Sequence, residues 1–153
     1  MNIKCKKLTE TAIIPTRATS GSAGYDMYSD ETVTIKPGET KFVSTGIVFG
    51  EDDHDFIKDC YITGNYVILM YPRSGLACKY GINLANGVGV IDKDYRGEVK
   101  AALHNNSQSE YTVNKGDRIT QCIFQPYIIP ELVESNDINN TDRNTSGFGS
   151  TGK

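Results

Sequence analysis

Residues 86–98 carry the clearest chemical pattern in the sequence, Asn-Gly-Val-Gly-Val-Ile-Asp-Lys-Asp-Tyr-Arg-Gly-Glu. Glycine lacks a Cβ atom, so the glycines of this stretch allow sharp turns and bring the backbone close to a ligand. On an extended chain, Asp92 and Asp94 point to one face and Tyr95 points to the other. Such a glycine-lined hairpin could hold a flat polar ring and let a carboxylate activate a water. A surface hairpin with a solvated acidic turn fits the same pattern.

Arg73, Ser74 and Gly75 form the best candidate for an anion site. They follow a long apolar run and open a stretch that predicts a helix over residues 74–81. We expect Ser74 to cap this helix at its start and Gly81 to end it. The N–H groups of the helix start, a hydroxyl and a guanidinium would then converge on a phosphate. The alternative is a plain capped helix with a surface arginine.

Polar residues elsewhere suggest further contacts to a charged ligand. Asp26 follows a Ser-Ala-Gly turn and could orient a metal-bound water, although a lone aspartate at a strand start is usually a turn residue. Gln121 lies in an apolar stretch and needs a hydrogen-bond partner if it is buried. The C-terminus matches Gly-x-x-x-x-Gly-Lys, but the strand and helix of a P-loop are missing around it. Arg143, Ser150 and Thr151 could still close over phosphates, with a floppy tail as the alternative.

Short strands separated by glycine- and proline-rich turns are expected along most of the chain. This pattern predicts an all-β sandwich or barrel with one short helix. The composition turns almost entirely polar after residue 133, so we expect a sandwich domain over residues 1–133 and a flexible arm over residues 134–153. Residues 51–64 are rich in acidic side chains and predict an exposed excursion. The strands are expected at residues 1–8, 25–28, 32–35, 41–49 (one or two strands), 66–71, 82–84, 99–104, 111–113, 119–125 and 127–133.

The composition excludes several classes of protein. A chain of 153 residues fits one domain. The net charge of −3 and the pI of about 5.4 leave no basic footprint for nucleic acid. No apolar run approaches the roughly 18 residues of a membrane span, and the first residues lack the apolar core expected of a signal peptide. Because the four cysteines form no Cys-x-x-Cys pair, we expect reduced thiols in an intracellular protein, cytoplasmic or nuclear.

Five short motifs, each weak alone, occur in one order along the chain. Together they resemble the five motifs of the homotrimeric dUTPase family and span residues 22–152. The motifs are Ser-Ala-Gly-Tyr-Asp (22–26), Pro-Arg-Ser-Gly-Leu-Ala (72–77), Gly-Val-Ile-Asp-x-Asp-Tyr-Arg-Gly (89–97), Gly-Asp-Arg-Ile-x-Gln (116–121) and Gly-Phe-Gly-Ser-Thr-Gly (147–152).

This resemblance implies a jelly-roll-like β-sandwich that assembles as a homotrimer, with active sites built between the subunits. The implied reaction is hydrolysis of dUTP to dUMP and pyrophosphate by water attack at the α-phosphorus. Asp92 would be the general base, and Gln121 would help to hold the attacking water. Magnesium would bind the triphosphate and reach Asp26 through a water. The C-terminal arm would close over the active site of a neighbouring subunit.

The resemblance also assigns the substrate contacts residue by residue. Tyr95 would pack under the deoxyribose and leave no room for a 2′-hydroxyl, and Phe148 would cover the uracil. The uracil and deoxyribose contacts would be Asn86, Gly89, Val90, Ile91, Asp92, Tyr95, Lys100, Phe148 and Gly149. The phosphate contacts would be Arg73, Ser74, Gly75, Gln121, Arg143, Ser150 and Thr151.

The chain departs from the family pattern in its tail, where Asn144 and Ser146 stand at positions usually held by glycine. Two alternatives remain at this point. One is a related enzyme that deaminates dCTP, which ammonia release would reveal. The other is a non-catalytic β-trimer, which would keep the core and fail to hydrolyse dUTP.

Overall fold

A computed structural model describes residues 2–51 and 65–147. The backbone of this part forms eleven strands and one helix, which confirms the all-β class and the single short helix. The acidic excursion expected at residues 51–64 lies almost wholly outside the described residues. The elements are β1 (Ile3–Lys7), β2 (Tyr25–Tyr28), β3 (Val33–Ile35), β4 (Thr40–Ser44), β5 (Ile47–Glu51), β6 (Tyr66–Pro72), α1 (Ser74–Tyr80), β7 (Ile82–Leu84), β8 (Gly89–Ile91), β9 (Lys100–Asn105), β10 (Tyr111–Val113) and β11 (Arg118–Pro126).

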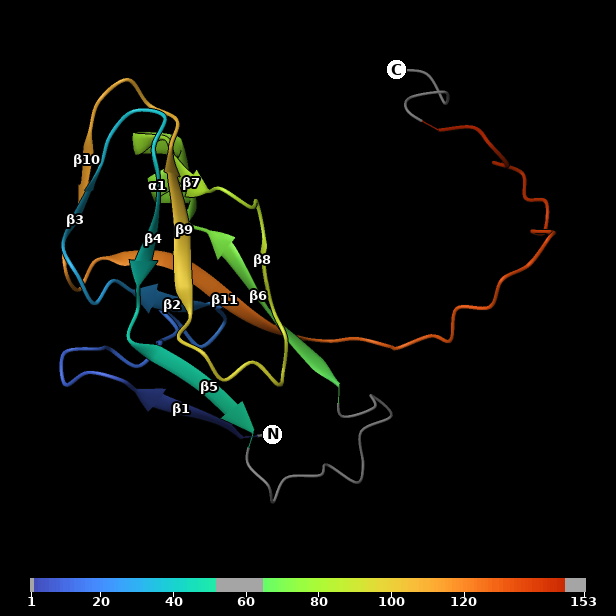
Figure 1. Ribbon diagram of the computed structural model, residues 1–153, viewed down its shortest axis with the longest axis horizontal. Coiled ribbons are helices and arrows are strands. Elements are labelled where there is room, and N and C mark those ends of the chain that lie inside the picture. Colours follow the sequence, from blue (N-terminus) through green and yellow to red (C-terminus); the bar gives the residue numbers. More distant parts are fainter. Residues whose placement is uncertain (1, 52–64, 148–153) are drawn as a thin grey trace.

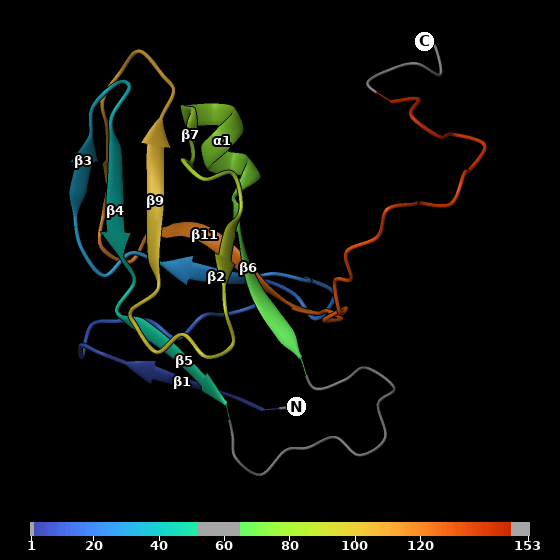
Figure 2. The ribbon, with the colours of Figure 1, turned by 45° about the vertical axis from the view of Figure 1, so that its right-hand side comes forward.

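The strands pair in antiparallel fashion into small sheets. One sheet has the strand order β2-β11-β6-β8 and another has the order β4-β9-β7, while β1 pairs with β5 and β10 pairs with β3. Strands β2 and β11 run across the direction of β4 and β9 (Figures 1 and 2). The sequence predicted a sandwich or a barrel. The described strands do not close into a barrel, so the sandwich is the alternative that the structure confirms.

Alternation along the longer strands builds the core. On β6, Tyr66, Ile68 and Met70 are buried, and on β9, Ala101 and Leu103 are buried while the residues between them are more exposed. This period of two residues is what a strand requires to cover a core with one face. Each fully buried side chain of this kind stabilises the fold by about 1.5–3 kcal/mol.

A buried carboxylate, Asp30, ties three segments of the sandwich together. It accepts hydrogen bonds from Thr9 (2.5 Å) and Thr11 (2.7 Å), and its Oδ1 lies 3.3 Å from the Lys115 ammonium. Burial alone would raise the pKa of Asp30, but these hydrogen bonds and the ammonium outweigh burial and lower it. The charged form of Asp30 is therefore stabilised by the folded structure.

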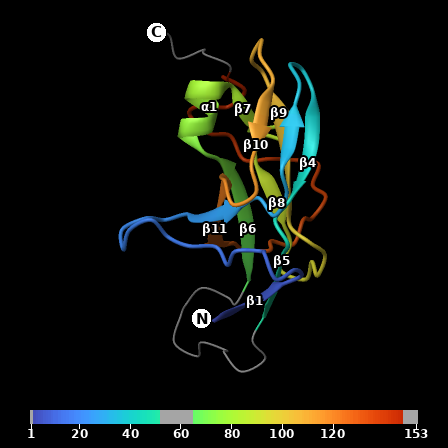
Figure 3. The same ribbon diagram turned by 90° about the vertical axis from the view of Figure 1, so that its left-hand side faces the viewer.

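Helix α1 follows β6 directly and packs beside β7 (Figure 3). Its end is as predicted, because Gly81 adopts the left-handed conformation with φ 68° and its N–H bonds Ala77 O at 3.1 Å. The prediction that Ser74 caps the start is wrong. Arg73 occupies the capping position in an extended conformation, without a side-chain cap, and Ser74 is the first helical residue.

The chain beyond β11 leaves the body of the molecule. The strand expected over residues 127–133 is absent, and residues 127–147 run outward as an extended trace (Figure 1). Exposed apolar side chains in this segment, such as Ile128 at 82% and Leu132 at 91%, pair with no sheet edge among the described residues. In the described residues, no helix is long and apolar enough to cross a membrane.

Candidate active site

The stretch at residues 86–98 does not form a two-stranded hairpin as predicted. Its apolar part, β8, pairs instead with β6, so that Ile91 lies opposite Ile68 and Gly89 opposite Met70. The charged part is a tight turn in which the Tyr95 N–H bonds Asp92 O at 3.1 Å. The alternation of side chains therefore ends with β8. The prediction that Asp92 and Asp94 point to one face assumed an extended chain, and it does not apply to this turn.

The turn before β8 brings Asn86 beside the backbone of Gly89. Gly87 takes a φ of 69°, a conformation that glycine adopts without strain, and the Val88 N–H bonds Asn86 O at 2.7 Å. A Cβ on Gly89 would lie 3.2 Å from Met70 Cβ and 3.6 Å from Asn86 Nδ2. Glycine at position 89 thus lets the strand lie close to both side chains.

The carboxylate of Asp92 is exposed at the end of β8. It forms no hydrogen bond or ion pair with any residue in the described ranges 2–51 and 65–147. Its neighbours Val90 and Ile91 are exposed and half-buried, respectively. A carboxylate held at a turn, with no partner among the described residues, is available to bind a water.

The ring of Tyr95 lies over Gly97. A Cβ at Gly97 would overlap the ring, with Cε2 only 2.9 Å away, so the tyrosine needs glycine at that position. The Tyr95 hydroxyl donates to Glu98 O at 3.1 Å, and the ring remains 48% exposed. The turn therefore presents an aromatic ring in a defined orientation.

Glu98 anchors this turn, and the sequence analysis missed it. Its Oε1 accepts a hydrogen bond from the Ser44 hydroxyl and another from the Gly46 N–H (2.9 Å), while Oε2 lies 3.4 Å from Lys100 Nζ. Burial would raise the pKa of Glu98, but these contacts outweigh it and lower the pKa. Lys100, predicted as a nucleoside contact, is thus engaged with Glu98.

A second group of predicted residues gathers where β6 meets α1. Arg73 Nε lies 3.0 Å from Asp26 Oδ1, and its Nη1 donates to the backbone carbonyl of Arg118 at 2.8 Å. Ser74 and Gly75 are exposed next to it, and a Cβ at Gly75 would meet nothing within 4 Å. The packing of this subunit therefore does not explain why position 75 is glycine.

Gln121 belongs to the same group and has the partner that its position predicted. Its Nε2 donates to Pro72 O at 3.2 Å. A Cβ at Gly24 would lie 2.6 Å from Gln121 Oε1, so the glycine leaves room for the amide. The amide is thus held beside Arg73 by the ends of two strands.

An irregularity in β11 puts Arg118 into this group as well. Arg118 pairs with Tyr28 and Gln121 pairs with Asp26, so three steps along β11 match two steps along β2. Such a bulge re-aims side chains, and here Arg118 Nη1 reaches Asp26 Oδ2 at 3.2 Å. The motif at residues 116–121 contained this arginine, but regular alternation gives no reason to group it with Gln121.

The side chains gathered where β6 meets α1 are called the Arg73 group here: Asp26, Arg73, Ser74, Gly75, Arg118 and Gln121. Asp92 and the Arg73 group lie at opposite ends of β6. Asp92 follows Ile91, which lies opposite Ile68, whereas Gln121 lies opposite Tyr71. Asp92 is therefore displaced from Gln121 by about four residues of strand, or about 13 Å. The turn after β8 and helix α1 also lie at opposite ends in two views (Figures 1 and 2). A single copy of the chain therefore does not bring the two groups into contact with the same water.

The tail supplies one described member of the predicted site. Arg143 is exposed, and the Ser146 N–H bonds its carbonyl at 2.9 Å. Asn144 adopts a positive φ of 45°, the left-handed conformation that glycine favours. The remaining predicted tail contacts, Phe148, Gly149, Ser150 and Thr151, lie outside the described residues.

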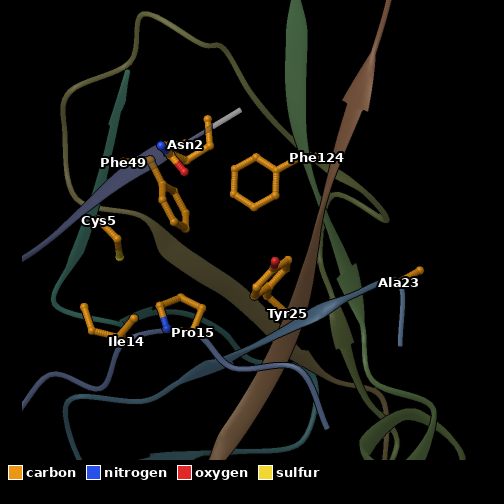
Figure 4. Close-up of a pocket in the computed structure, with 9 residues that line it drawn as sticks. Asn2, Cys5, Ile14, Pro15, Ala23, Tyr25, Phe49 and Phe124 are labelled. Carbon is orange, nitrogen blue, oxygen red and sulfur yellow. The ribbon is translucent and has the colours of Figure 1, made fainter. Parts of the chain in front are cut away.

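A cavity of about 470 Å³ lies elsewhere, between the β1-β5 pair and the β2-β11 end of the larger sheet. The rings of Tyr25, Phe49 and Phe124 surround it, and Phe124 packs edge-on against both of the others (Figure 4). Its other lining residues are mainly apolar, and none of the predicted site residues is among them. This cavity is separate from the candidate active site.

The described residues provide few ligands for a metal ion. No three histidine, cysteine, aspartate or glutamate side chains of this part gather around one point. Asp26 is the only predicted metal contact, and each of its oxygens already faces a guanidinium. This donor set fits water-mediated contact with a Mg²⁺ that is held mainly by phosphates, which is a usual arrangement for this ion.

Comparison with known proteins identifies the class. The dUTPase family model matches residues 10–152, and the chain belongs to this family of hydrolases. It is 42% identical over 153 residues to the deoxyuridine 5′-triphosphate nucleotidohydrolase of Nautilia profundicola, covering all of both chains. The enzyme described here is thus a hydrolase that acts on dUTP.

Solved structures agree in fold. A dUTPase of Staphylococcus bacteriophage 80alpha, solved with dUPNHPP, matches with a TM-score of 0.85 and 26% identity, covering 99% of each chain. A dUTPase mutant from phage phi11 of S. aureus, described as coordinating a structural Mg(II) ion, matches with a TM-score of 0.78 and 23% identity. It covers 92% of this chain and all of the other. These matches support the jelly-roll character of the sandwich.

Proposed function

We propose that the enzyme converts dUTP to dUMP and pyrophosphate by attack of a water on the α-phosphorus, with Asp92 as general base. The observation that carries this assignment is the exposed Asp92 carboxylate, fixed at a turn and without a described partner. A base needs a lone pair directed at the water and a stable position, rather than an unusual pKa. Gln121 would hold the same water from a neighbouring subunit.

The phosphates would bind at the start of α1. Arg73 has two of its guanidinium nitrogens engaged with Asp26 and the Arg118 carbonyl, which leaves N–H groups directed elsewhere. Open space at Gly75 would let phosphate oxygens approach the backbone. Arg143, Ser150 and Thr151 would add contacts from the arm, and Mg²⁺ on the triphosphate would neutralise charge and improve the leaving group.

The nucleoside would bind along β8 and at the turns that precede and follow it. Asn86 and the backbone of residues 89–91 would hydrogen-bond the uracil, with no room for a 5-methyl group. Tyr95, oriented by Gly97 and Glu98, would exclude a 2′-hydroxyl. Lys100 would also contact the nucleoside, while Phe148 and Gly149 would cover the base. A site that excludes the wrong nucleotide by shape, or that leaves buried polar groups unpaired when it binds, discriminates between nucleotides more strongly than one that relies on apolar contacts.

The separation along β6 supports a homotrimer with shared sites, which we propose as the active assembly. Because Asp92 and Gln121 are about 13 Å apart along the strand, a complete site needs Asp92 of one copy beside Gln121 of another. The exposed chain after β11 would extend to a neighbouring subunit, as an arm over residues 134–153. The sandwich domain would then comprise residues 1–133.

Pyrophosphate release from dUTP, dTTP, dCTP and UTP with Mg²⁺ tests the reaction. We expect turnover of dUTP alone and its near loss in Asp92→Asn, with the trimer and its melting temperature retained. Ammonia release from dCTP would instead support the deaminase, and a folded trimer inactive on all four nucleotides would support a binding module.

Mixed trimers test the shared site. Asp92→Asn and Gln121→Ala each disable a different half, so mixing unfolded subunits and refolding them should rebuild intact sites. If one site draws these residues from two chains, about a quarter of the sites regain both. Refolding each variant alone is the control. A mixture as inactive as its parents would refute the shared site.

A further inference from the structure

Arg118 lies in the Arg73 group, although no substrate contact is assigned to it. Its guanidinium is about half exposed, and Nη1 lies 3.2 Å from Asp26 Oδ2. Arg73 Nε lies 3.0 Å from the other oxygen, Oδ1, of the same carboxylate. One aspartate thus bridges two arginines, one through each oxygen. The Asp26 side chain is only 14% exposed, so its orientation is constrained.

We propose that Arg118 is a positioning residue, which acts through Asp26 to orient the Arg73 guanidinium toward the substrate phosphates. This inference rests on the proposed phosphate-binding role of Arg73. Arg118 itself contacts no substrate in this proposal. It holds the second oxygen of Asp26, so that the first oxygen stays directed at Arg73 Nε.

The geometry explains why a second arginine is useful. An arginine side chain has several rotatable bonds, and a single ion pair at a partly exposed site stabilises one conformation only weakly. Arg73 is held at two points, by Asp26 and by the Arg118 carbonyl at 2.8 Å. The Arg118 residue therefore contributes to both points, through its backbone directly and through its side chain by way of Asp26.

The bulge in β11 makes this arrangement possible. It sets Arg118 opposite Tyr28 while Gln121 lies opposite Asp26, and the Arg118 side chain reaches across to Asp26. A small pocket of about 200 Å³ separates the arginines from β10 and is lined also by Tyr111 and Asp117. Among the described residues, Asp117 forms no ion pair with either arginine, and its Oδ2 accepts the Asn114 N–H at 2.8 Å.

Arg118→Met tests the proposal, since it removes the guanidinium and keeps an unbranched side chain. We expect kcat/KM for dUTP to fall about tenfold, because a misplaced phosphate ligand costs binding and rate. Binding of the non-hydrolysable dUpNHpp should weaken similarly, while binding of deoxyuridine, which has no phosphate, stays within about twofold. Arg118→Lys should recover part of the loss. Arg17→Met, which removes another exposed arginine, is the matched control.

A double-mutant cycle with Asp26→Asn separates positioning from other roles. If Arg118 acts through Asp26, then Arg118→Met has almost no further effect on dUpNHpp binding once Asp26 is asparagine. If the double variant loses dUpNHpp affinity by the product of the two single-variant losses, the proposal is overturned. Equal weakening of dUpNHpp and deoxyuridine would also overturn it, because it indicates a structural defect.

The binding measurements keep this test separate from the proposed reaction. If the wild type binds dUpNHpp but hydrolyses no dUTP, the reaction fails and the comparison of the two ligands still decides the role of Arg118. Unchanged dUpNHpp binding in Arg118→Met overturns the role of Arg118 alone. Should that variant fail to fold, Arg118→Gln, which is polar but shorter, is subject to the same two criteria.

Discussion

Replacing Gly97 by alanine should disturb substrate selection more than folding. The new Cβ would overlap the outer end of the Tyr95 ring, whose Cε2 would lie 2.9 Å away. The ring is 48% exposed and is joined to the backbone by rotatable bonds. We therefore expect the ring to rotate outward, while the backbone of the turn stays in place.

The free-energy cost of this rotation can be estimated from the contacts that it breaks. The Tyr95 hydroxyl would lose its hydrogen bond to Glu98 O, now 3.1 Å long, which is worth about 1 kcal/mol. Glu98 itself keeps its bonds to Ser44 and Gly46. A displaced ring no longer blocks the 2′-position of a ribonucleotide. The preference for dUTP over UTP, measured as a ratio of kcat/KM values, should then fall by about tenfold or more.

Steady-state kinetics on dUTP and UTP, together with denaturant unfolding, measure both effects. Gly21→Ala is the matched control, because a Cβ at Gly21 meets nothing within 4 Å. Tyr95→Phe keeps the ring but removes its hydroxyl, so it should lower stability without admitting UTP. An unchanged preference for dUTP in Gly97→Ala would refute the role given to the Tyr95 ring.

Three further predictions concern stability and reactivity. Gly75→Ala should raise the free energy of unfolding by about 0.5–1 kcal/mol, because alanine favours helix more than glycine does. The same change should lower kcat/KM for dUTP, and unchanged kinetics would contradict a phosphate site at this position. The pKa of Asp30 is lowered in the folded state, so its contribution to stability is complete above its ordinary value of 3.8 and is lost as the pH falls through the folded value. The stability difference between wild type and Asp30→Asn, measured by unfolding at each pH, should therefore shrink in acid rather than grow. Burial raises the pKa of Cys122 to about 12, so iodoacetamide at pH 8 should label the exposed Cys78 and spare Cys122, as mass spectrometry of peptides would show.

Local sequence patterns predicted most of the strands. The strands at residues 25–28, 82–84 and 111–113 have the predicted bounds, because alternation and turn residues determine short strands locally. The end of α1 at Gly81 was predictable for a similar reason, since few residues other than glycine adopt its backbone conformation readily. The strand expected at residues 127–133 is wrong, because apolar residues form a strand only when a partner edge is present.

The hairpin at residues 86–98 shows the limit of such patterns. The sequence indicated glycines and an acidic turn correctly, but the pairing partner of β8 is β6, which is about 20 residues away along the chain. The role of Glu98 has no local signal, because its partners Ser44 and Gly46 lie 54 and 52 residues away along the chain. The contact of Gly97 with Tyr95 is local, but it depends on the conformation of the turn, which alternation does not encode.

Local motifs predicted the residues that we propose to bind and hydrolyse the nucleotide, and they indicated the family to which the chain belongs. Each motif is local, so its glycines, arginine or aspartate can be recognised without knowledge of the fold. The pairing of distant strands places these residues in two separate groups. The register of β6 with β8 and β11 separates Asp92 from Gln121, and the bulge in β11 joins Arg118 to Asp26. Register and bulges arise from pairing between distant strands, so they exist only once the chain has folded.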